Sequence, residues 1–306
     1  MTKVFIDGSA GTTGLRIWER LSDRKDLSLI ILSEENRKNP DARREAINSA
    51  DIAFLCLPDA AAVEAVSFIE NKNTAVIDTS TAHRTAEGWD YGFAELSGQR
   101  EKIAKSKRIS NPGCHASGFI ALVRPLVEAG VLSEKASLTC TSLTGYSGGG
   151  KKMIAEYEDE GRSPLLDAPR MYGLSQNHKH LKEMAAHSFI ENVPAFMPIV
   201  APFYSGMEVS IPLFTKDING SLEDIKKVYK EYYTTAMVKY SDADEEGFLS
   251  AGLLSMKDNM IVSVYGNEER IVLVSRYDNL GKGASGAAIQ NMNILLGIDE
   301  TTGLSI

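Results

Sequence analysis

The chain has 306 residues, of which 43% are hydrophobic and 24% charged, and its formal net charge is −8 at pH 7. This composition is typical of a globular protein with room for two domains, and it excludes an intrinsically disordered chain. The negative net charge argues against nucleic acid as the main ligand, because binding a polyanion needs a concentrated basic surface.

The N-terminus and the cysteines indicate the compartment. The chain starts MTKVFIDG, a strand-like segment that lacks the basic and apolar regions of a secretion signal, and no apolar run reaches membrane length. The three cysteines, Cys56, Cys114 and Cys140, are odd in number and widely spaced, which favours free thiols in a reducing compartment. We therefore expect a cytoplasmic protein that binds neither membrane nor nucleic acid.

The first half of the chain alternates short apolar runs with amphipathic segments. The runs KVFID, LSLIIL, DIAFLCL and TAVIDTS are predicted to be buried strands. RISNPGC contains the end of a further strand, and SGFIALVRPLVEAG is predicted to be a helix closed by Gly130. The alternation predicts the α/β class, with a doubly wound parallel sheet of the Rossmann type.

After about residue 135 strand signals dominate, in ASLTCTSLTG, FMPIVAPFYSGMEVSIPLF, NMIVSVYG and RIVLVSRYD. A Gly-Asn hairpin turn joins the last two. The segment SLEDIKKVYKEYYTTAM is predicted to be a helix, with Ser221 as its N-cap and Asp224 three residues later. The tail GKGASGAAIQNMNILLG is predicted to be a helix of small and apolar residues. We therefore expect a second, α+β domain with a mostly antiparallel sheet.

A glycine-rich turn follows the first predicted strand in the pattern G-x-x-G-x-x-G. The first glycine allows a tight turn, the second lets the backbone approach a pyrophosphate, and the third lets the helix pack near the strand. The helix N-terminus also attracts phosphate. A plain glycine turn is the alternative, but the position in the alternating pattern favours dinucleotide binding. The candidate residues are Gly8, Ala10, Gly11, Thr12, Thr13 and Gly14.

The end of the second predicted strand indicates which dinucleotide binds. The segment ILSEENRK offers Ser33, followed by Arg37 and Lys38, and this pattern tolerates a 2′-phosphate on the ribose. Glu34 and Glu35 leave NAD open, because a carboxylate there can bind the ribose hydroxyl instead. We favour NADP as the cofactor.

The segment NPGCHASGF places Cys114 at a predicted helix start. Pro112 fixes the entry of the chain, Gly113 leaves space, and unpaired helix N–H groups lower the pKa of a thiol and can hold an oxyanion. Cys56 and Cys140 lie inside predicted strands and are expected to be inert. A helix-start cysteine without chemistry is the alternative for Cys114.

A histidine-rich segment, NHKHLKEM, supplies candidate proton donors. On a helix His180 and Glu183 share a face, so the carboxylate could orient the imidazole for proton transfer. Zinc is disfavoured, because His178 and His180 at i and i+2 of a helix point apart and no third ligand is close. His115 is expected to shape the surroundings of the thiol, and His187 to be a surface helix residue.

Further polar residues are candidates for binding the substrate or its phosphate. Arg84, in DTSTAHRT, could grip a phosphate or carboxylate in bidentate fashion. Ser147 and Lys151 lie in TGYSGGGKK, for which a mobile loop with solvated lysines is the alternative. Ser80 and Asn111 complete the set, and the sequence leaves open which of these cations and hydroxyls meets phosphate.

With these motifs the chain resembles the N-acetyl-gamma-glutamyl-phosphate reductase family in its shorter form. The resemblance covers the whole chain, and its specific segments are NPGCHASGF and YDNLGKGASGAAIQNMN. It implies NADPH-dependent reduction of an acyl phosphate to an aldehyde in arginine biosynthesis, with Cys114 as nucleophile and His180 as acid/base residue. Lys182 stands where the family's histidine motif would have proline, which leaves the roles of His178 and His180 open.

The resemblance also implies a domain division and an assembly. Residues 1–113 and 283–306 would form a discontinuous NADP-binding domain, and residues 114–282 a catalytic and dimerisation domain. Subunits would assemble through the second sheet into a homo-oligomer, dimer or tetramer. Two alternatives remain at this stage: aspartate-semialdehyde dehydrogenase, which acts on a smaller acyl phosphate, and a non-catalytic NADP-binding regulator.

Overall fold

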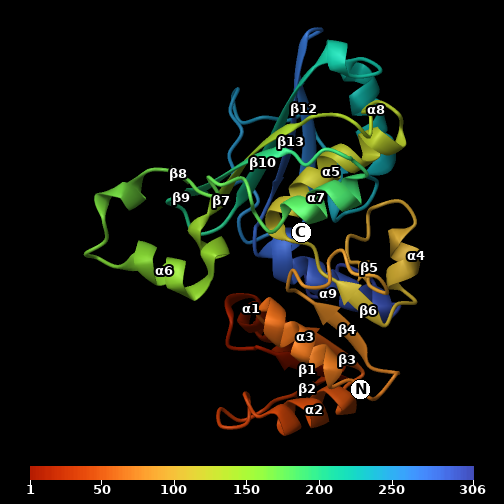
Figure 1. The fold of residues 1–306 in the computed structure, drawn as a ribbon, viewed down its shortest axis with the longest axis vertical. Helices are drawn as coiled ribbons and strands as arrows, with labels where there is room; N and C mark the ends of the chain where they lie inside the picture. Colours follow the sequence, from red (N-terminus) through yellow and green to blue (C-terminus); the bar gives the residue numbers. More distant parts are fainter. The chain divides into compact units, whose positions relative to one another are not determined.

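The computed structural model describes residues 1–306, which form two compact units (Figure 1). The first comprises Met1–Pro112 and Ala284–Leu304, and the second comprises Gly113–Gly283 and Ser305–Ile306. The sequence-based division assigns Gly113, Gly283 and the last two residues to the first domain instead. No helix is both long and apolar enough to cross a membrane.

The first unit is a six-stranded sheet with the order β2-β1-β3-β4-β6-β5, and every neighbouring pair is parallel. This confirms the predicted α/β class and the doubly wound parallel sheet. Its elements are β1 (Thr2–Asp7), α1 (Thr12–Ser22), β2 (Leu27–Ile30), α2 (Pro40–Ser49), β3 (Ile52–Leu55), α3 (Asp59–Ser67), β4 (Ala75–Asp78), β5 (Asp90–Tyr91), α4 (Gln99–Ile103), β6 (Arg108–Ser110) and α9 (Gly286–Leu295).

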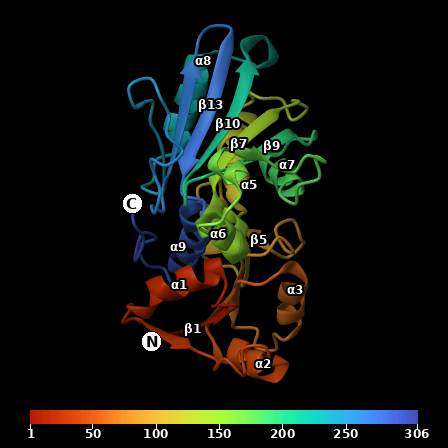
Figure 2. The same cartoon turned by 90° about the vertical axis from the view of Figure 1, so that its left-hand side faces the viewer.

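Both faces of this sheet are covered, because alternate strand residues point to opposite sides. Val4 and Ile6 of β1 pack with residues of α1 and α9, whereas Phe5 packs on the other face with residues of α2 and α3. Figure 2 shows α1 and α9 on one side of β1 and α3 on the other. The chain's C-terminal helix therefore completes the first sheet's core.

The second unit contains a seven-stranded sheet with the order β11-β12-β13-β10-β7-β9-β8. Its elements are α5 (Cys114–Glu128), β7 (Thr139–Gly145), η1 (Tyr146–Gly149), α6 (Gly150–Glu158), η2 (Pro164–Asp167), β8 (Arg170–Met171), α7 (Leu181–Ser188), β9 (Ala195–Ala201), β10 (Met207–Phe214), η3 (Thr215–Asp217), α8 (Leu222–Tyr232), β11 (Val238–Tyr240), β12 (Met260–Gly266), β13 (Arg270–Tyr277) and the π-helical turn η4 (Gly281–Ser285).

This second sheet is mixed, so the expectation of a mostly antiparallel sheet needs correction. The pairs β7–β9 and β11–β12 are parallel, and the other neighbours are antiparallel. The direction of a strand cannot be read from its apolar residues alone. A long connection that includes α6 and α7 joins β7 to β9, and such a connection allows the two strands to run parallel. The hairpin between β12 and β13 does form as predicted, after Gly266.

Helix α5 is the buried centre of the second unit. Eleven of its fifteen residues are buried, and it contacts β10 and β13 of the sheet as well as α7 and α8. Figure 1 shows α5, α7 and α8 together over one face of the sheet. The helix ends where predicted, with Gly130 in the left-handed conformation at φ 72°. Cys114 is its first residue.

Helix α8 begins with the predicted cap. Ser221 Oγ accepts the Asp224 N–H, and Asp224 Oδ2 accepts the Ser221 N–H at 2.8 Å, which together form a capping box. Tyr229, inside α8, and Tyr233, at its C-cap, donate hydroxyl hydrogen bonds to carbonyls of α5. The cap therefore supports a helix that fixes the position of α5.

Replacing Ser221 with alanine is expected to lower the free energy of unfolding by about 1 kcal/mol, because the orphan N–H group of the first turn loses its acceptor. Urea denaturation measures the change. Glu231→Ala, an exposed position in the last turn of the same helix, is the control and should change stability by less than about 0.5 kcal/mol. Equal effects of the two substitutions would contradict the capping argument.

Candidate active site

Cys114 lies at the N-terminus of α5, where the sequence places it. The preceding residue, Gly113, is the N-cap, with extended backbone at φ −78° and ψ 146°. The N–H of Gly113 donates to Oε1 of Glu183, at 2.8 Å. Cys114 itself is only partly buried, so its thiol is accessible at the positive end of a fifteen-residue helix.

The other two cysteines have different surroundings. Cys56 directly follows β3, and burial raises the pKa of its thiol to about 12. Cys140 lies within β7, and burial raises the pKa of that thiol as well. Both therefore remain protonated and unreactive at neutral pH, as the sequence analysis expects. All three cysteines are free.

Three histidine rings, one of them that of His115 directly after Cys114, lie close together. The ring centroids of His178 and His180 lie 4.8 Å apart at nearly right angles, and each lies 5.6 Å from the ring of His115. The expectation that His178 and His180 point apart was wrong, because α7 begins only at Leu181 and His180 is its N-cap. A helical spacing rule does not apply to residues that precede the helix.

Glu183 has a contact that its spacing from His180 does not predict. It lies in the first turn of α7, it is 2% exposed, and its carboxylate accepts the N–H of Gly113 at the entry to α5. A buried carboxylate stabilises such an N–H strongly, because the hydrogen bond is charge-assisted. Glu183 therefore fixes the residue before the thiol.

His115 is a neutral member of this cluster. Its Nδ1 is 2.7 Å from Ser142 Oγ and its Nε2 is 2.7 Å from the hydroxyl of Tyr172. Burial, and secondly the neighbouring His178, lower the pKa of His115 to about 3. It is therefore uncharged at neutral pH and cannot serve as an imidazolium acid, and its hydrogen bonds order the groups around it. Neither Ser142 nor Tyr172 carries a local sequence signal that would have placed it here.

The remaining candidates in the second unit are held in different ways. The hydroxyl of Ser147 is buried and accepts a hydrogen bond from Asn279 Nδ2 at 3.0 Å. Lys151 is exposed in the first turn of α6. The segment TGYSGGGKK is a 3₁₀ turn followed by α6, so it is regular rather than a loop. His187 lies half-buried in the last turn of α7.

The donor set offers no metal centre. No group of three His, Cys, Asp or Glu side chains has an arrangement that could hold a metal ion. The three clustered histidines do not form such a group, and both ring nitrogens of His115 already face oxygen atoms of Ser142 and Tyr172.

In the first unit the glycine-rich turn joins β1 to α1. Gly8 has φ +87°, and a Cβ atom there would lie 2.3 Å from the carbonyl oxygen of Cys56. A Cβ atom on Gly14 would lie 2.4 Å from the carbonyl oxygen of Gly8. The turn and the close helix packing therefore both require glycine, as the motif predicts. Gly11 is the N-cap of α1, and Thr12 and Thr13 form its first turn.

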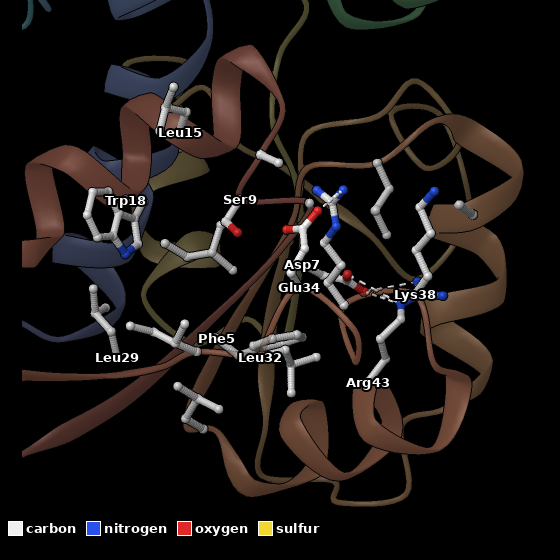
Figure 3. Close-up of a pocket in the computed structure, with 18 residues that line it drawn as sticks. Phe5, Asp7, Ser9, Leu15, Trp18, Leu29, Leu32, Glu34, Lys38 and Arg43 are labelled. Carbon is white, nitrogen blue, oxygen red and sulfur yellow. Dashed lines mark hydrogen bonds and ion pairs between the residues drawn. The ribbon is translucent and has the colours of Figure 1, made fainter.

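A cavity of about 550 Å³ opens beside this turn (Figure 3). Leu15, Trp18 and Leu29 lie on one side of it, and Glu34 and Lys38 on the other. Of the predicted cofactor residues, the lining includes Gly8, Ala10, Arg37 and Lys38 but not Gly11, Thr12, Thr13, Gly14 or Ser33. An apolar half and a cationic half suit the adenosine end of a phosphorylated dinucleotide.

The cations of this cavity differ in how they are held. Arg37 forms an exposed ion pair with Glu34. Arg43, which the sequence analysis missed, is buried and pairs with Asp7 at 3.0 Å and Glu64 at 2.9 Å. Burial raises the pKa of Asp7, although Arg43 opposes the shift. Lys38 is exposed at the cavity edge.

A buried polar cluster contains Ser80 and Arg84. The Asp78 carboxylate accepts a hydrogen bond from Ser80 Oγ at 2.7 Å and lies 2.6 Å from Nδ1 of His83, whose ring stacks on Trp89. Arg84 donates from Nε to the carbonyl of Asn111, at 2.9 Å. These bonds order the strand ends that precede Cys114 in the chain.

The Asn111 side chain is similarly engaged. Its amide nitrogen donates to the carbonyl of Ala284 at 2.9 Å, and its amide oxygen accepts from Asn291 at 3.2 Å. Asn111 and Arg84, two of the five candidate phosphate ligands, are therefore engaged in hydrogen bonds within the protein.

The two folds, the helix-start cysteine with its histidines in the second unit, and the cavity of the first unit together indicate a class of protein. The family described as semialdehyde dehydrogenase, NAD binding domain, matches residues 3–106, and the semialdehyde dehydrogenase dimerisation domain matches residues 114–279. The chain belongs to this oxidoreductase family. The solved aspartate semialdehyde dehydrogenase II of Vibrio cholerae shares the fold, with a TM-score of 0.72 at 18% identity over 97% of this chain and 99% of that one.

More similar relatives are known by sequence. The chain is 45% identical to N-acetyl-gamma-glutamyl-phosphate reductase 2 of a Nostoc species, over 99% of both chains. It is 46% identical to the N-acetyl-gamma-glutamyl-phosphate reductase of Brucella ovis, over 96% of this chain and 99% of the relative. The family resemblance seen in the sequence motifs is confirmed.

Replacing His115 with glutamine is expected to reduce the loss of stability between pH 7 and pH 5. The folded protein keeps His115 neutral because its pKa is about 3, whereas the unfolded imidazole titrates near 6.5. Protons therefore favour the unfolded state as the pH falls from 6.5 towards 3, by about 2 kcal/mol at pH 5.

Urea denaturation of both proteins at the two pH values measures this difference. Ser142→Ala is the control, because it removes a hydrogen bond of His115 but leaves the titrating ring. It should lower stability while retaining most of the pH dependence. Parallel stability curves for the parent and His115→Gln would show that His115 contributes no such linkage.

Proposed function

We propose that the protein reduces N-acetyl-gamma-glutamyl phosphate with NADPH, which gives N-acetylglutamate semialdehyde and phosphate in arginine biosynthesis. The observation that carries the proposal is the accessible Cys114 thiol at the start of α5, beside three histidines. The names of the relatives at 45% and 46% identity support the substrate. We assign cofactor binding to residues 1–113 with 283–306, and catalysis to residues 114–282.

The first step is attack of the Cys114 thiolate on the acyl carbon. The sulfur–carbon bond forms as the carbon–oxygen bond to phosphate breaks, and inorganic phosphate leaves with the bonding electrons. The product is a thioester on Cys114. The N–H groups at the start of α5 have no acceptor within the helix, and we propose that they stabilise both the thiolate and the oxyanion that develops on the acyl oxygen.

The second step reduces this thioester. Bound NADPH supplies a hydride to the carbonyl carbon, and a thioester accepts hydride more readily than a carboxylate does. We assign His180 as the donor of a proton to the developing oxyanion, since it is buried at the N-cap of α7 within the histidine cluster. His178 is the alternative donor, although burial lowers its pKa. Collapse of the thiohemiacetal returns the hydroxyl proton to that histidine as the carbon–sulfur bond breaks, which releases the aldehyde and the thiolate.

The substrate's phosphate needs a cation or hydroxyl near Cys114. Our candidates are Ser80, Arg84, Asn111, Ser147 and Lys151. Among them Lys151 is exposed, so it can reach a bound phosphate without first giving up a buried partner. Glu183 supports the reaction through the N–H of Gly113, which it holds in place.

Homo-oligomerisation and location are also part of the proposal. The matched second domain is described as a dimerisation domain, and we propose a dimer or tetramer that assembles through the second sheet. One face of that sheet is covered by α5 and α8, which leaves the other for a second copy. The net charge of −8 and the absence of a membrane-spanning helix agree with a cytoplasmic enzyme of small-molecule metabolism.

Acylation of Cys114 tests this function directly. Incubation with the acyl phosphate but without NADPH is expected to add one N-acetylglutamyl group, which intact-mass measurement detects. Cys114→Ser should show no stable thioester adduct and lose activity by at least about three orders of magnitude. Cys56→Ser is the control and should be acylated normally.

The same experiment separates the rivals. Adduct formation with aspartyl phosphate instead would identify an aspartate-semialdehyde dehydrogenase. A protein that binds NADPH but is not acylated by either compound would be a non-catalytic regulator.

Cofactor choice gives a second test. Arg37→Ala and Lys38→Ala are each expected to raise the KM for NADPH by about tenfold, because each removes a charge-assisted contact to the 2′-phosphate. The KM for NADH should change little, since NADH lacks that phosphate. Lys25→Ala, exposed but outside the cavity lining, is the control. Equal losses with both cofactors would contradict a 2′-phosphate site.

A further inference from the structure

A tyrosine hydroxyl lies inside the first turn of α5. Tyr277, the last residue of β13, donates to the carbonyl oxygen of Cys114 at 2.6 Å and accepts the N–H of Gly118 at 3.1 Å. In a regular helix these two backbone groups bond to each other, as residues i and i+4. The hydroxyl therefore contacts both partners of the second hydrogen-bonded pair of the helix, which follows the bond from the Ser117 N–H to the Gly113 carbonyl.

The absence of a side chain at Gly118 leaves room for this hydroxyl. A Cβ atom on Gly118 would lie 2.5 Å from the Tyr277 hydroxyl oxygen and 2.6 Å from Val209. Any side chain at residue 118 would thus displace the bridge. Tyr277 is completely buried, and its neighbours in the sheet are Met207 on β10 and Met260 on β12. The hydroxyl is therefore held by the centre of the sheet.

The hydrogen bond from Tyr277 fixes the direction of the Cys114 carbonyl and, with it, that of the following N–H group. The Cys114 carbonyl and the His115 N–H belong to one planar trans peptide, so they point in opposite directions. That N–H is among the helix-start donors that have no acceptor within the helix. Anchoring the carbonyl to the sheet therefore also fixes the direction of this donor.

We propose that Tyr277 is a positioning residue for Cys114: through the Cys114 carbonyl it orients the helix-start donors that stabilise the thiolate and the oxyanion. The proposal rests on the function assigned to Cys114 above. Burial raises the pKa of Tyr277 well above its usual range, so the hydroxyl remains a donor at every working pH.

The chain contains a matched control. Tyr233 also donates its hydroxyl to a backbone carbonyl of α5, that of Ala121, at 2.7 Å. Both tyrosines are buried, and both bonds join the same helix to neighbouring structure. The Ala121 carbonyl lies in the middle of the helix, seven residues beyond the thiol. Tyr277→Phe and Tyr233→Phe therefore remove the same kind of bond at different distances from Cys114.

The experiment measures the rate at which iodoacetamide alkylates Cys114 as a function of pH, with the modified peptide identified by mass. In Tyr277→Phe the midpoint of this profile is expected to rise by about one pH unit, which slows alkylation at pH 7 by about tenfold. The kcat of reduction should fall as well, with KM within about twofold of the parent. Tyr233→Phe should leave the alkylation profile and kcat unchanged.

Three outcomes would overturn the proposal. Equal alkylation profiles for the two variants would leave Tyr277 with a purely structural role, and a raised KM with unchanged kcat would instead place it against the substrate. Gly118→Ala, which must move the hydroxyl, should shift the profile in the same direction as Tyr277→Phe; an unchanged profile would also refute the bridge. Alkylation needs no substrate. The comparison of Tyr277→Phe with Tyr233→Phe therefore tests the role of Tyr277 even if Cys114 proves not to be acylated.

Discussion

The placement of the first residue of α5 is the constraint on which the site depends. Two backbone groups at this end of the helix have partners that are distant in the sequence. Glu183 accepts the N–H of Gly113, and Tyr277 holds the carbonyl of Cys114. Further along the helix Tyr229 and Tyr233 hold the carbonyls of Leu122 and Ala121. These bonds anchor the helix that carries the thiol and its N–H donors. Such preorganisation favours the covalent catalysis that we propose.

The histidine cluster shows how burial separates chemically similar groups. His115 adjoins the nucleophile in sequence, yet both its ring nitrogens face hydroxyl groups and its pKa falls to about 3. It is therefore suited to ordering neighbours and unsuited to donating protons at neutral pH. For proton transfer we therefore propose His180, with His178 as the alternative. Proximity to Cys114 in the sequence is thus a poor guide to the acid, because the environment of each imidazole decides its protonation.

Local patterns in the sequence predict several features well. The apolar runs of the first unit's strands, the glycines at positions 8 and 14 and the capping box at Ser221 in the second unit are each decided by neighbours within a few residues. The bond between Tyr277 and Cys114 spans 163 residues, and that between Glu183 and Gly113 spans 70. No short-range sequence pattern predicts contacts between residues so far apart in the chain. The direction of β7 and β9 escaped prediction for the same reason.

The two arginines of the first unit's cavity illustrate why charge counts alone do not identify a cofactor. Arg43 is buried between Asp7 and Glu64, and taking it from them would leave a buried carboxylate unpaired, at a cost of about 3–5 kcal/mol. Arg37 is 40% exposed in its pair with Glu34, and breaking an exposed pair costs at most about 1 kcal/mol. An incoming phosphate can therefore recruit Arg37 but not Arg43. The nearby Glu34 competes for the same cation, so our proposal needs Arg37 and Lys38 to act together on the 2′-phosphate.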